Sequence, residues 1–562
     1  MKSIKYYLGL LSLLVVSSAY AQNEDDLKTE TIDVVKPYDP SVSNADKINE
    51  QPSFSDTTFV SEDLSYRIFS KQFQTEEKID TLSAADQKIK KSILGNSGFV
   101  RLGYGNFNTP YAEMSINTVK KKKYALGMYY RHHSSEGNID EVPFSGFSDN
   151  KLKLYGKKFF RAATLSADIG YERNVFHYYG GSNFSVPVAE VPKGDIRQQF
   201  GTFDVQLLLE STKKKGQAFF DKAVLDFYSM RDDYDMTENY FALNTNISRK
   251  LFKQDLQFEV GVEQLSTSFG EELFDHSLTN IHFNPKLSNS KDKFNYRLGV
   301  HMILNFDQTF GDNITNLFVY PDIDISFPFI DDYIILYGGL HGKLHTNSFR
   351  SLATQNPFIT SGYANKLTNE QFRLTGGLKG SLSEKVAYNV NLNAALVNNL
   401  QVFDVETVLN SDRTTLGILY PDANVYNMNA ELSYRKDDLY RFTFIADYFI
   451  YDMDVLNEAY HRPDWKLSTD AQVKINDKLG ATASLFYIGT RYSNLTNFTQ
   501  PGDDIEMELD AIIDINLGLT YKMVKSWNAF VRVNNLLNKN YEYWNSYPVQ
   551  GLNIIGGVQY TF

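Results

Sequence analysis

Apolar and polar residues alternate along most of this chain, from about Phe99 to its last residue, Phe562. In the segment 386–394, every second residue of VAYNVNLNA is apolar, and asparagine fills three of the four positions between them. Successive side chains of a β-strand point to opposite faces of the sheet, so this pattern predicts a strand with one apolar and one polar face. The same alternation recurs at 202–210, 256–263, 426–434 and 513–521. We therefore expect an all-β chain.

The connections between these strands also follow a pattern. Short joints are predicted at 120–123, 160–162, 212–216, 252–254, 288–292, 328–331, 382–385, 435–438, 476–478 and 524–526. Mostly longer loops are predicted between them, at 134–149, 174–194, 346–369, 399–422, 493–509 and 538–551. Counting segments in this way gives about 22 strands, an even number with both chain ends on one side, as outer-membrane barrels require. We expect a transmembrane antiparallel β-barrel over residues 96–562, with both of its ends facing the periplasm.

Charge and aromatic residues support a barrel that crosses a membrane. Basic residues crowd the short joints, as at Lys120–Lys123, whereas several proposed outer loops are acidic, including Asp232–Asp235 and Asp503–Asp510. Aromatic pairs near strand ends predict girdles at the membrane–water interface; they are Tyr129–Tyr130, Phe159–Phe160, Tyr178–Tyr179 and Phe219–Phe220. The 42% hydrophobic fraction fits a barrel, because only alternate residues meet lipid or lipopolysaccharide. Beyond the N-terminus no run approaches the ~18 apolar residues of a membrane helix, which excludes helical membrane proteins.

The first 95 residues differ from the barrel. Met1–Ala21 has the features of a secretory signal peptide, with Lys2 and Lys5 before a short apolar core and Ala-Tyr-Ala before Gln22. Residues 22–95 contain 15 acidic and 9 basic residues, with no glycine before Gly95. Such a segment lacks the apolar surface for a core of its own, so we expect an extended periplasmic leader.

Composition and motifs exclude several kinds of chemistry. The chain has no cysteine, which excludes disulfides, thiol nucleophiles and Cys-ligated zinc, and its net charge of −12 makes nucleic acid a poor partner. His341 and His345 invite comparison with a metal pair, but four residues along a strand span roughly 13 Å, so no metal site is predicted there. His132 and His133 are expected on opposite faces. The 503–510 acid run is expected to be a solvated loop, with a divalent cation as the alternative. No hydrolase, phosphate-loop or dinucleotide motif occurs, and we expect neither an enzyme nor a cofactor.

The last strand ends in a recognisable pattern. Val558, Tyr560 and Phe562 share one face of the segment LNIIGGVQYTF. A final strand that ends in phenylalanine is similar to the signal that outer-membrane assembly machinery recognises. We therefore expect these three side chains to act as an assembly signal.

The residues before this strand resemble a family motif. The run VNNLLNKNYE at 533–542, followed by Tyr547-Pro548 and Gly551, resembles the closing motif of TonB-dependent receptor barrels. The run departs from the motif at Leu537 and Asn538, where the family usually has Phe and Asp. The resemblance implies a 22-stranded receptor barrel, in agreement with the strand count.

The N-terminal part departs further from that family. Its receptors carry a large glycine-rich plug inside the barrel, and residues 22–95 are too short and too poor in glycine for one, so we expect the plug to be absent. The segment Glu30, Thr31, Ile32, Asp33, Val34 and Val35 resembles the short box that engages TonB. An ordinary extended stretch is the competing interpretation.

Three classes of function remain open at this point: an accessory subunit, a transport protein and, third, an outer-membrane hydrolase, for which no Ser/His pair stands out. A ring of this size encloses a wide lumen that needs filling, by the leader, by inward loops or by a partner protein. Without a plug, the first hypothesis is an accessory or structural subunit of an outer-membrane complex for protein assembly or export, which would bind protein partners through residues 22–95. The alternative is transport, either by a TonB-dependent uptake receptor or by a passive channel.

Overall fold

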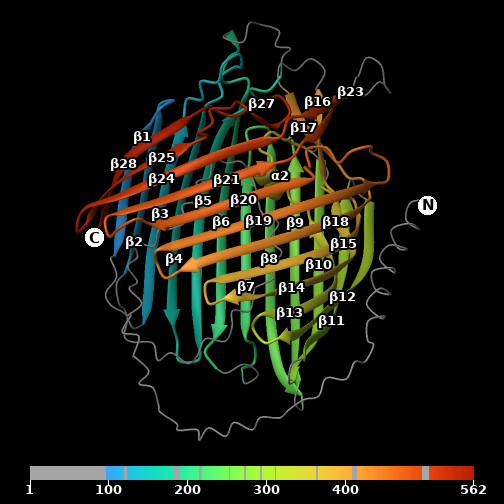
Figure 1. The fold of residues 1–562 in the computed structure, drawn as a ribbon. Coiled ribbons are helices and arrows are strands. Elements are labelled where there is room, and N and C mark those ends of the chain that lie inside the picture. Colours follow the sequence, from blue (N-terminus) through green and yellow to red (C-terminus); the bar gives the residue numbers. More distant parts are fainter. Residues whose placement is uncertain are drawn as a thin grey trace, which may run out of the picture. The chain divides into compact units, whose positions relative to one another are not determined.

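The computed structural model describes residues 97–118, 123–181, 190–213, 218–251, 254–270, 274–291, 294–309, 312–362, 365–407, 414–495 and 505–562. These residues form one closed barrel of 22 antiparallel strands, which confirms the predicted fold class and strand number (Figure 1). The signal peptide, the leader and the TonB-box-like segment Glu30–Val35 lie outside the described residues. Within the described ranges, no helix has the length and hydropathy of a membrane span.

The barrel strands are β1 (Gly98–Gly105), β2 (Thr109–Asn117), β3 (Tyr124–Ser135), β4 (Phe147–Phe159), β5 (Ala163–His177), β6 (Arg197–Ser211), β7 (Lys222–Arg231), β8 (Met236–Leu251), β9 (Gln254–Phe269), β10 (Phe274–Lys291), β11 (Phe294–Thr309), β12 (Asp312–Ile330), β13 (Ile334–Thr346), β14 (Leu367–Ser383), β15 (Val386–Asn398), β18 (Ala423–Lys436), β19 (Tyr440–Met453), β20 (Trp465–Lys474), β21 (Leu479–Ile488), β24 (Ile512–Val524), β25 (Trp527–Asn534) and β28 (Asn553–Thr561). Smaller elements lie in the long connections: α2 (Phe349–Gln355), β16 (Val402–Thr407), β17 (Thr414–Leu419), β22 (Arg491–Leu495), β23 (Ile505–Leu509), β26 (Glu542–Trp544) and β27 (Tyr547–Pro548).

The first and last strands close the ring. Gly98 donates its backbone N–H to the Phe562 carbonyl at 3.1 Å, and Phe562 donates back to Gly98 at 3.0 Å. Across the same seam, Arg101 donates from Nε to Gln559 Oε1 at 3.0 Å. A Cβ atom on Gly557 would lie 2.1 Å from the Leu102 carbonyl oxygen, so only glycine allows β1 and β28 to approach this closely. The start of β1 and the end of β28 therefore both lie at the end of the barrel that carries the short turns.

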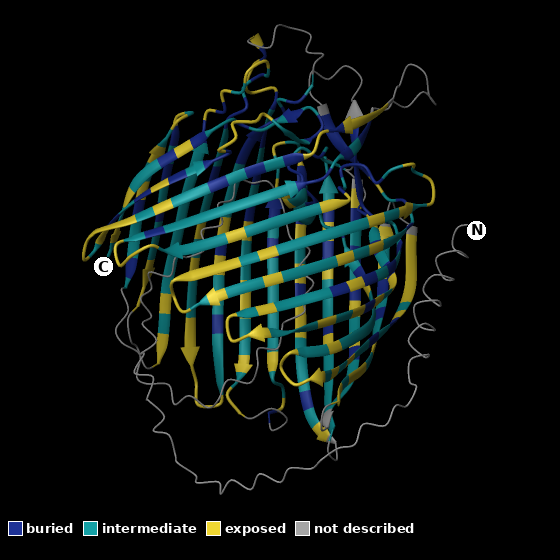
Figure 2. Cartoon of the chain, viewed as in Figure 1, coloured by how far each residue is buried: buried dark blue, intermediate teal, exposed yellow. Residues whose placement is uncertain are grey.

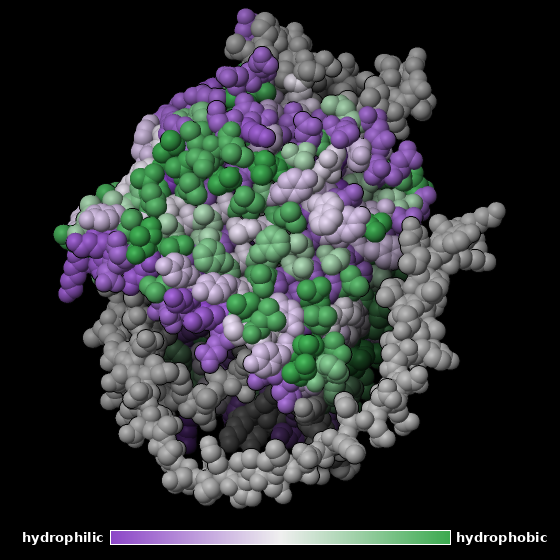
Figure 3. All heavy atoms as spheres, in the orientation of Figure 1, coloured by the Kyte–Doolittle hydropathy of each residue, from purple (hydrophilic) through white to green (hydrophobic). Residues whose placement is uncertain are grey.

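The two faces of the wall differ as the alternation predicts. On β12, Leu317 and Val319 face outward and are 67% and 57% exposed, whereas Tyr320 and Asp322 face the lumen and are 3% and 8% exposed. Apolar side chains spread over the outer face around β24, β25 and β28, and hydrophilic ones gather at the long-loop end (Figure 3). Val558, Tyr560 and Phe562 are outward-facing on the last strand and its end, and their role as an assembly signal stays a prediction.

Two of the four aromatic pairs lie where an interface girdle would place them. Phe159, Phe160 and Phe219 are exposed near the short turns. The other two expectations are wrong. Tyr129 faces the lumen, where its hydroxyl donates to Glu113 at 3.0 Å, and Tyr178 is 1% exposed in a core of packed loops. A pattern of adjacent aromatics does not distinguish these environments, because each depends on which loop covers the strand end.

The largest buried core lies at the long-loop end of the barrel (Figure 2). We call the loops that build it the cap: the described parts of residues 347–366, 399–422 and 535–552. Its core joins side chains of β5–β8 to side chains of these loops, namely Phe176, Phe200, Tyr228, Met230, Phe349, Leu352, Ile359, Phe403, Leu416, Trp544 and Tyr547. The cap therefore joins strands on one side of the barrel to loops that leave other strands.

Candidate functional site

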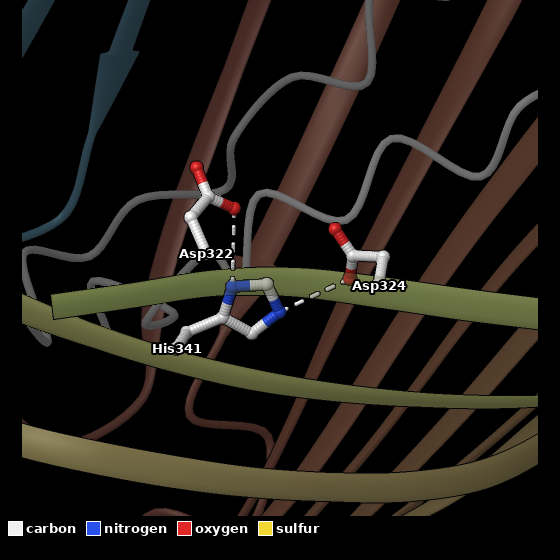
Figure 4. Close-up of side chains that lie close together, drawn as sticks. All are labelled: Asp322, Asp324 and His341. Carbon is white, nitrogen blue, oxygen red and sulfur yellow. Dashed lines mark hydrogen bonds and ion pairs between the residues drawn. The ribbon is translucent and has the colours of Figure 1, made fainter. Parts of the chain in front are cut away.

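The lumen wall carries a compact cluster of two aspartates and a histidine. Strand β12 presents Asp322 and Asp324, and the register pairs Asp322 with His341 on β13. The imidazole of His341 lies between the two carboxylates (Figure 4). Its Nδ1 is 3.4 Å from Asp322 Oδ1, and its Nε2 is 3.0 Å from Asp324 Oδ1. One ring thus contacts a carboxylate through each of its nitrogens.

Two basic side chains complete this cluster. Lys286 Nζ lies 3.1 Å from Asp322 Oδ2 and 2.9 Å from Glu259 Oε2. Arg297 pairs with Asp324, and its Nη2 is 3.6 Å from Asp322 Oδ1. One ligand atom from each of Asp322, Asp324 and His341 lies within 4.8 Å of the others, a spacing that a metal ion can bridge. Because both imidazole nitrogens already face carboxylates and two cations adjoin them, the arrangement favours an ion-pair network over a metal centre.

A second histidine group lies on neighbouring strands of the same wall. His282 Nδ1 on β10 is 3.3 Å from His301 Nε2 on β11. On its other side, His282 Nε2 is 3.5 Å from Glu263 Oε1, and that oxygen also accepts from Asn280 at 2.7 Å and Thr346 at 2.8 Å. Strands β9–β13 therefore present several linked polar groups to the lumen.

His132 and His133 lie on opposite faces of β3, as expected, whereas His341 and His345 lie on opposite faces of β13 for a reason that alternation does not predict. A register shift between His341 and Lys343 inverts the alternation on β13. Leu344 consequently packs against Ile303 and Tyr320 on the lumen side, which turns His345 to the other face, away from His341. His132 contacts Asn150 through Nδ1 at 2.8 Å, whereas the ring of His133 packs edge-on against that of Tyr111. Each pair is thus divided between two faces.

Of the acidic run, Asp503 and Asp504 lie outside the described residues. Its continuation is not a free loop, because Ile505–Leu509 pairs with β22 as β23. The Asp510 carbonyl accepts from Arg491 Nη2 at 2.9 Å. Glu506, Glu508 and Asp510 are exposed, as expected of a solvated run, but residues 505–509 form a paired strand and not a loop.

The cap is fastened to the wall by a buried carboxylate. Glu238, at the start of β8, is 0% exposed. It accepts the backbone N–H groups of Phe349 and Arg350 at 2.5 and 3.0 Å, the first turn of α2. It also accepts the hydroxyls of Tyr228 at 2.9 Å and Thr267 at 3.2 Å. One side chain thus satisfies donors from two neighbouring strands and from the loop at 347–366.

Asp232 forms a second fastening in the turn before β8. Its Oδ1 accepts from the backbone N–H groups of Tyr234 at 2.9 Å and Met236 at 2.8 Å. Its Oδ2 accepts from Gln198 at 3.1 Å and from the hydroxyl of Ser361 in the cap. Burial raises the pKa of Asp232, and these hydrogen bonds oppose the rise. The sequence placed Asp232 in an acidic outer loop, and the structure shows that the cap covers its side chain there.

The opposite part of the cap packs against a buried arginine and a buried histidine, which come from two further loops. Arg491, 0% exposed, donates to the carbonyls of Tyr543 at 2.8 Å and Glu542 at 3.1 Å. His461 Nδ1 donates to the Phe403 carbonyl at 2.9 Å, and its Nε2 accepts the N–H of Asn545 at 3.2 Å. Burial lowers the pKa of His461 to about 4, so the ring is neutral at neutral pH. These contacts join four separate loops into one layer.

The structure thus defines a site in two parts, an ordered cap at one end of the barrel and a charged lumen wall below it. Sequence reasoning did not single out Glu238, Asp322 or Asp324. The contacts that make them distinctive come from residues that lie elsewhere in the chain, 17 positions away for Asp324 with His341 and 111 positions away for Glu238 with Phe349.

Solved structures with the same fold are outer-membrane receptors. The pyoverdine receptor FpvA from Pseudomonas aeruginosa PAO1 matches with a TM-score of 0.64 and 12% identity, over 84% of this chain and 79% of that one. The FrpB iron transporter from Neisseria meningitidis matches with a TM-score of 0.64 and 11% identity, over 83% of this chain and 82% of that one. The siderophore receptor PirA from Acinetobacter baumannii matches with a TM-score of 0.60 and 14% identity, over 84% of this chain and 81% of that one. No protein-family model and no curated protein sequence matches the chain.

At these identities the likeness establishes the fold. The chain is an outer-membrane β-barrel with the architecture of TonB-dependent receptors, as the C-terminal motif indicated. A further neighbour of the same fold is the copper transporter OprC, with a TM-score of 0.61 and 11% identity over 84% of this chain and 81% of that one.

Proposed function

We propose that this protein is an outer-membrane uptake receptor of the TonB-dependent type. The observation that carries the proposal is the pairing of an ordered cap with a charged lumen wall in a barrel of receptor architecture. Anchored loops at the mouth supply a surface that can bind a solute, and the ion-pair network at Asp322, Asp324 and His341 lines a hydrophilic path. We likewise propose that the protein performs no chemistry on the solute.

The names of the structural neighbours suggest a first solute class. They are receptors or transporters for iron, siderophores or copper, and we propose metal ions or their chelates as the solutes to test. Cells that contain the protein as their only such receptor should accumulate the metal, as measured by elemental mass spectrometry. Metal contents equal to those of cells without the protein, for iron and copper alike, would contradict this class.

Energised uptake requires contact with TonB, for which the segment Glu30–Val35 is the candidate. The C-terminal domain of TonB should retain the full chain in a pull-down, and Ile32→Pro with Val34→Pro should abolish retention because an added strand needs backbone donors. If TonB still retains the substituted chain, the contact with TonB is made by other residues or the proposed contact is wrong.

A conductance measurement separates uptake from a passive channel. In planar bilayers the receptor should pass little current, and deletion of Gln22–Gly95 tests whether the leader fills the lumen. Large steady conductance of the full chain would favour a passive channel. Conductance only after the deletion would assign the leader a plug role, and no conductance from either form would make the cap the main barrier.

The accessory role in protein assembly or export is the second candidate. The observation that favours it is the short leader of 22–95, which is acidic and almost free of glycine, unlike a receptor plug. Purification in mild detergent decides between the two. A stable, stoichiometric envelope protein that leaves when 22–95 is deleted would favour the accessory role, and a barrel without companions would favour uptake.

A further inference from the structure

The short-turn end of the barrel has an uneven distribution of charge. Six turns follow one another across the seam, from β20–β21 through β24–β25, β2–β3, β4–β5 and β6–β7 to β8–β9. Counting the described turn residues and three strand residues on either side, these turns hold 12 cations and 4 carboxylates. The cations are Lys123, Lys157, Lys158, Arg161, Lys213, Lys222, Arg249, Lys250, Lys474, Lys478, Lys522 and Lys525, and the carboxylates are Glu210, Asp221, Asp255 and Asp477. We call these six turns the basic arc.

The rest of this end lacks the excess of positive charge. Apart from β10–β11, whose turn residues lie outside the described ranges, the turns β12–β13, β14–β15 and β18–β19 hold 4 cations and 5 carboxylates by the same count: Lys385, Arg435, Lys436 and Arg441 against Asp331, Asp332, Glu384, Asp437 and Asp438. The excess is therefore confined to one side of the barrel, although the chain as a whole has a net charge of −12.

Little in the described protein neutralises the basic arc. Among the described residues of the arc, Lys474 Nζ forms an ion pair with Asp477 Oδ1 at 3.0 Å. The side chain of Asp477 is 96% exposed. Lys158 lies 5.8 Å above the ring of Phe160, and Arg249 donates to the Ala218 carbonyl at 2.7 Å, so these contacts order two cations without cancelling their charge. The arc is thus a surface that an anionic partner would stabilise.

Each of four turns in the arc also exposes a large apolar side chain beside its cations. Phe160 is 51% exposed, Phe219 84%, Ile475 54% and Val524 61%. These residues continue the apolar outer face of the strands to the level of the turns. A cation next to an apolar side chain at this level suits a lipid interface, where the apolar group enters the acyl region and the cation meets headgroup phosphates.

We propose that the basic arc binds anionic phospholipid headgroups in the leaflet at the short-turn end. Phospholipids carrying a net negative charge, such as phosphatidylglycerol, supply both the phosphate and the acyl chains that the paired residues require. A soluble acidic partner would use the cations but leave Phe160, Phe219, Ile475 and Val524 in water. The acidic leader of 22–95 is the other anionic candidate, and the experiment below distinguishes it. The proposal does not depend on which solute the barrel carries.

The test compares lipid preference in matched variants of the full chain. The protein is placed in mixed phosphatidylglycerol–phosphatidylcholine micelles, and native mass spectrometry measures the ratio of the two lipids that stay bound. The arc variant is Lys157→Gln, Lys158→Gln and Arg161→Gln, and the control is Lys385→Gln, Arg435→Gln and Lys436→Gln on the other side of the same end. We expect a preference for phosphatidylglycerol that falls at least about fivefold in the arc variant and stays in the control. Raising the salt concentration should weaken the preference, because exposed charges are screened.

Further variants keep the result unambiguous. A variant with Lys157→Arg, Lys158→Arg and Arg161→Lys keeps the charge and should preserve the preference for phosphatidylglycerol. Heat-modifiable migration on gels shows that each variant is folded. An equal loss in the control variant, or no loss in the arc variant, would overturn the proposal. A preference that rises after deletion of 22–95, with no further effect of the arc substitutions, would overturn it in favour of the leader.

Discussion

At the scale of single residues, the cap depends on carboxylates and a histidine removed from water. Glu238 accepts four hydrogen bonds in a fully buried position, and two of them come from the first turn of α2. Buried donors without a partner cost free energy, so the fastening is sensitive to small changes. The barrel ladder, by contrast, draws its stability from backbone pairing along every strand.

Glu238→Ala should open the cap while leaving the barrel closed. The substitution leaves the N–H groups of Phe349 and Arg350 and the Tyr228 hydroxyl without their acceptor, at a local cost of about 3 kcal/mol or more. Hydrogen exchange should rise over 347–366 and not in the strands of the wall. Glu210→Ala, at an exposed carboxylate on β6, serves as the control. Unchanged exchange in the loop would contradict the assignment of Glu238 as its anchor.

His461 makes the stability of the cap depend on pH. Its folded pKa of about 4 lies below the ordinary value of 6.5, so between these values the opened state binds more protons than the closed one. The contribution of this histidine is complete above pH 6.5 and is lost as the pH falls towards 4, a change of about 3 kcal/mol. Protonation would place a hydrogen on Nε2 opposite the N–H of Asn545, beside the charge of Arg491.

Tryptophan fluorescence can follow this transition, because the ring of Trp544 lies 5.3 Å from that of His461. We expect the signal to change between pH 6.5 and 4 and the change to shrink in His461→Gln. A profile that is the same in both proteins would assign the transition to other groups, such as Asp232 or Glu542, whose pKa values are raised by burial.

At the scale of elements, the strands were predictable and the loops were not. Alternation located the strands because each has one face to lipid and one to the lumen, a requirement that acts on every second residue. The loop at 347–366 follows no such rule. Its helix α2 is short, and its position is set by Glu238 and Asp232 on other elements. For the same reason Tyr178 was assigned to a girdle, although it belongs to the cap.

The candidate site shows the same division. The position of Asp322 on a polar face follows from its place between Pro321 and Ile323, but its partner His341 depends on the register of β12 against β13. That register is set by a three-residue turn and an irregularity near Pro328, which a pattern of alternation does not encode. Local sequence therefore predicts which side chains face the lumen, and pairing geometry decides which of them meet.

Two cap loops can be locked together through Thr360 and Thr415. Their Oγ1 atoms lie 2.5 Å apart, and Thr360 donates its N–H to the Leu416 carbonyl at 3.0 Å. Because the chain has no cysteine, Thr360→Cys with Thr415→Cys would provide the only disulfide. Under oxidising conditions we expect metal uptake to fall by at least about tenfold, with recovery after reduction. Each single variant should behave like the wild type. Uptake that continues with the loops locked would show that the cap need not open there.

At the scale of the whole molecule, closure of the barrel depends on the pairing of its first strand, β1, with its last strand, β28. Deletion of Phe562 removes both backbone hydrogen bonds to Gly98 and an outward aromatic group 39% exposed. We expect the fraction of barrel in the outer membrane to fall at least about fivefold, because the seam and the proposed assembly signal are lost together. Heat-modifiable migration measures this fraction.

Phe562→Tyr separates the two causes. It keeps the backbone and an aromatic ring, so assembly should be close to that of the wild type. Phe562→Ala keeps the backbone alone, and a loss equal to that of the deletion would assign the effect to the side chain. Full assembly of the deleted form would dismiss both roles.

The seam between β1 and β28 also determines when the barrel can close. Ser97 and Phe562 are in contact although 465 positions separate them, so the ring has no complete form until the last residue of the chain has been delivered. Until then the growing sheet keeps two unpaired edges whose donors and acceptors invite pairing with other chains. A ribosome that stops early, or a protease that trims the end, leaves a product that cannot close. A closed barrel in the envelope has therefore kept strand β28.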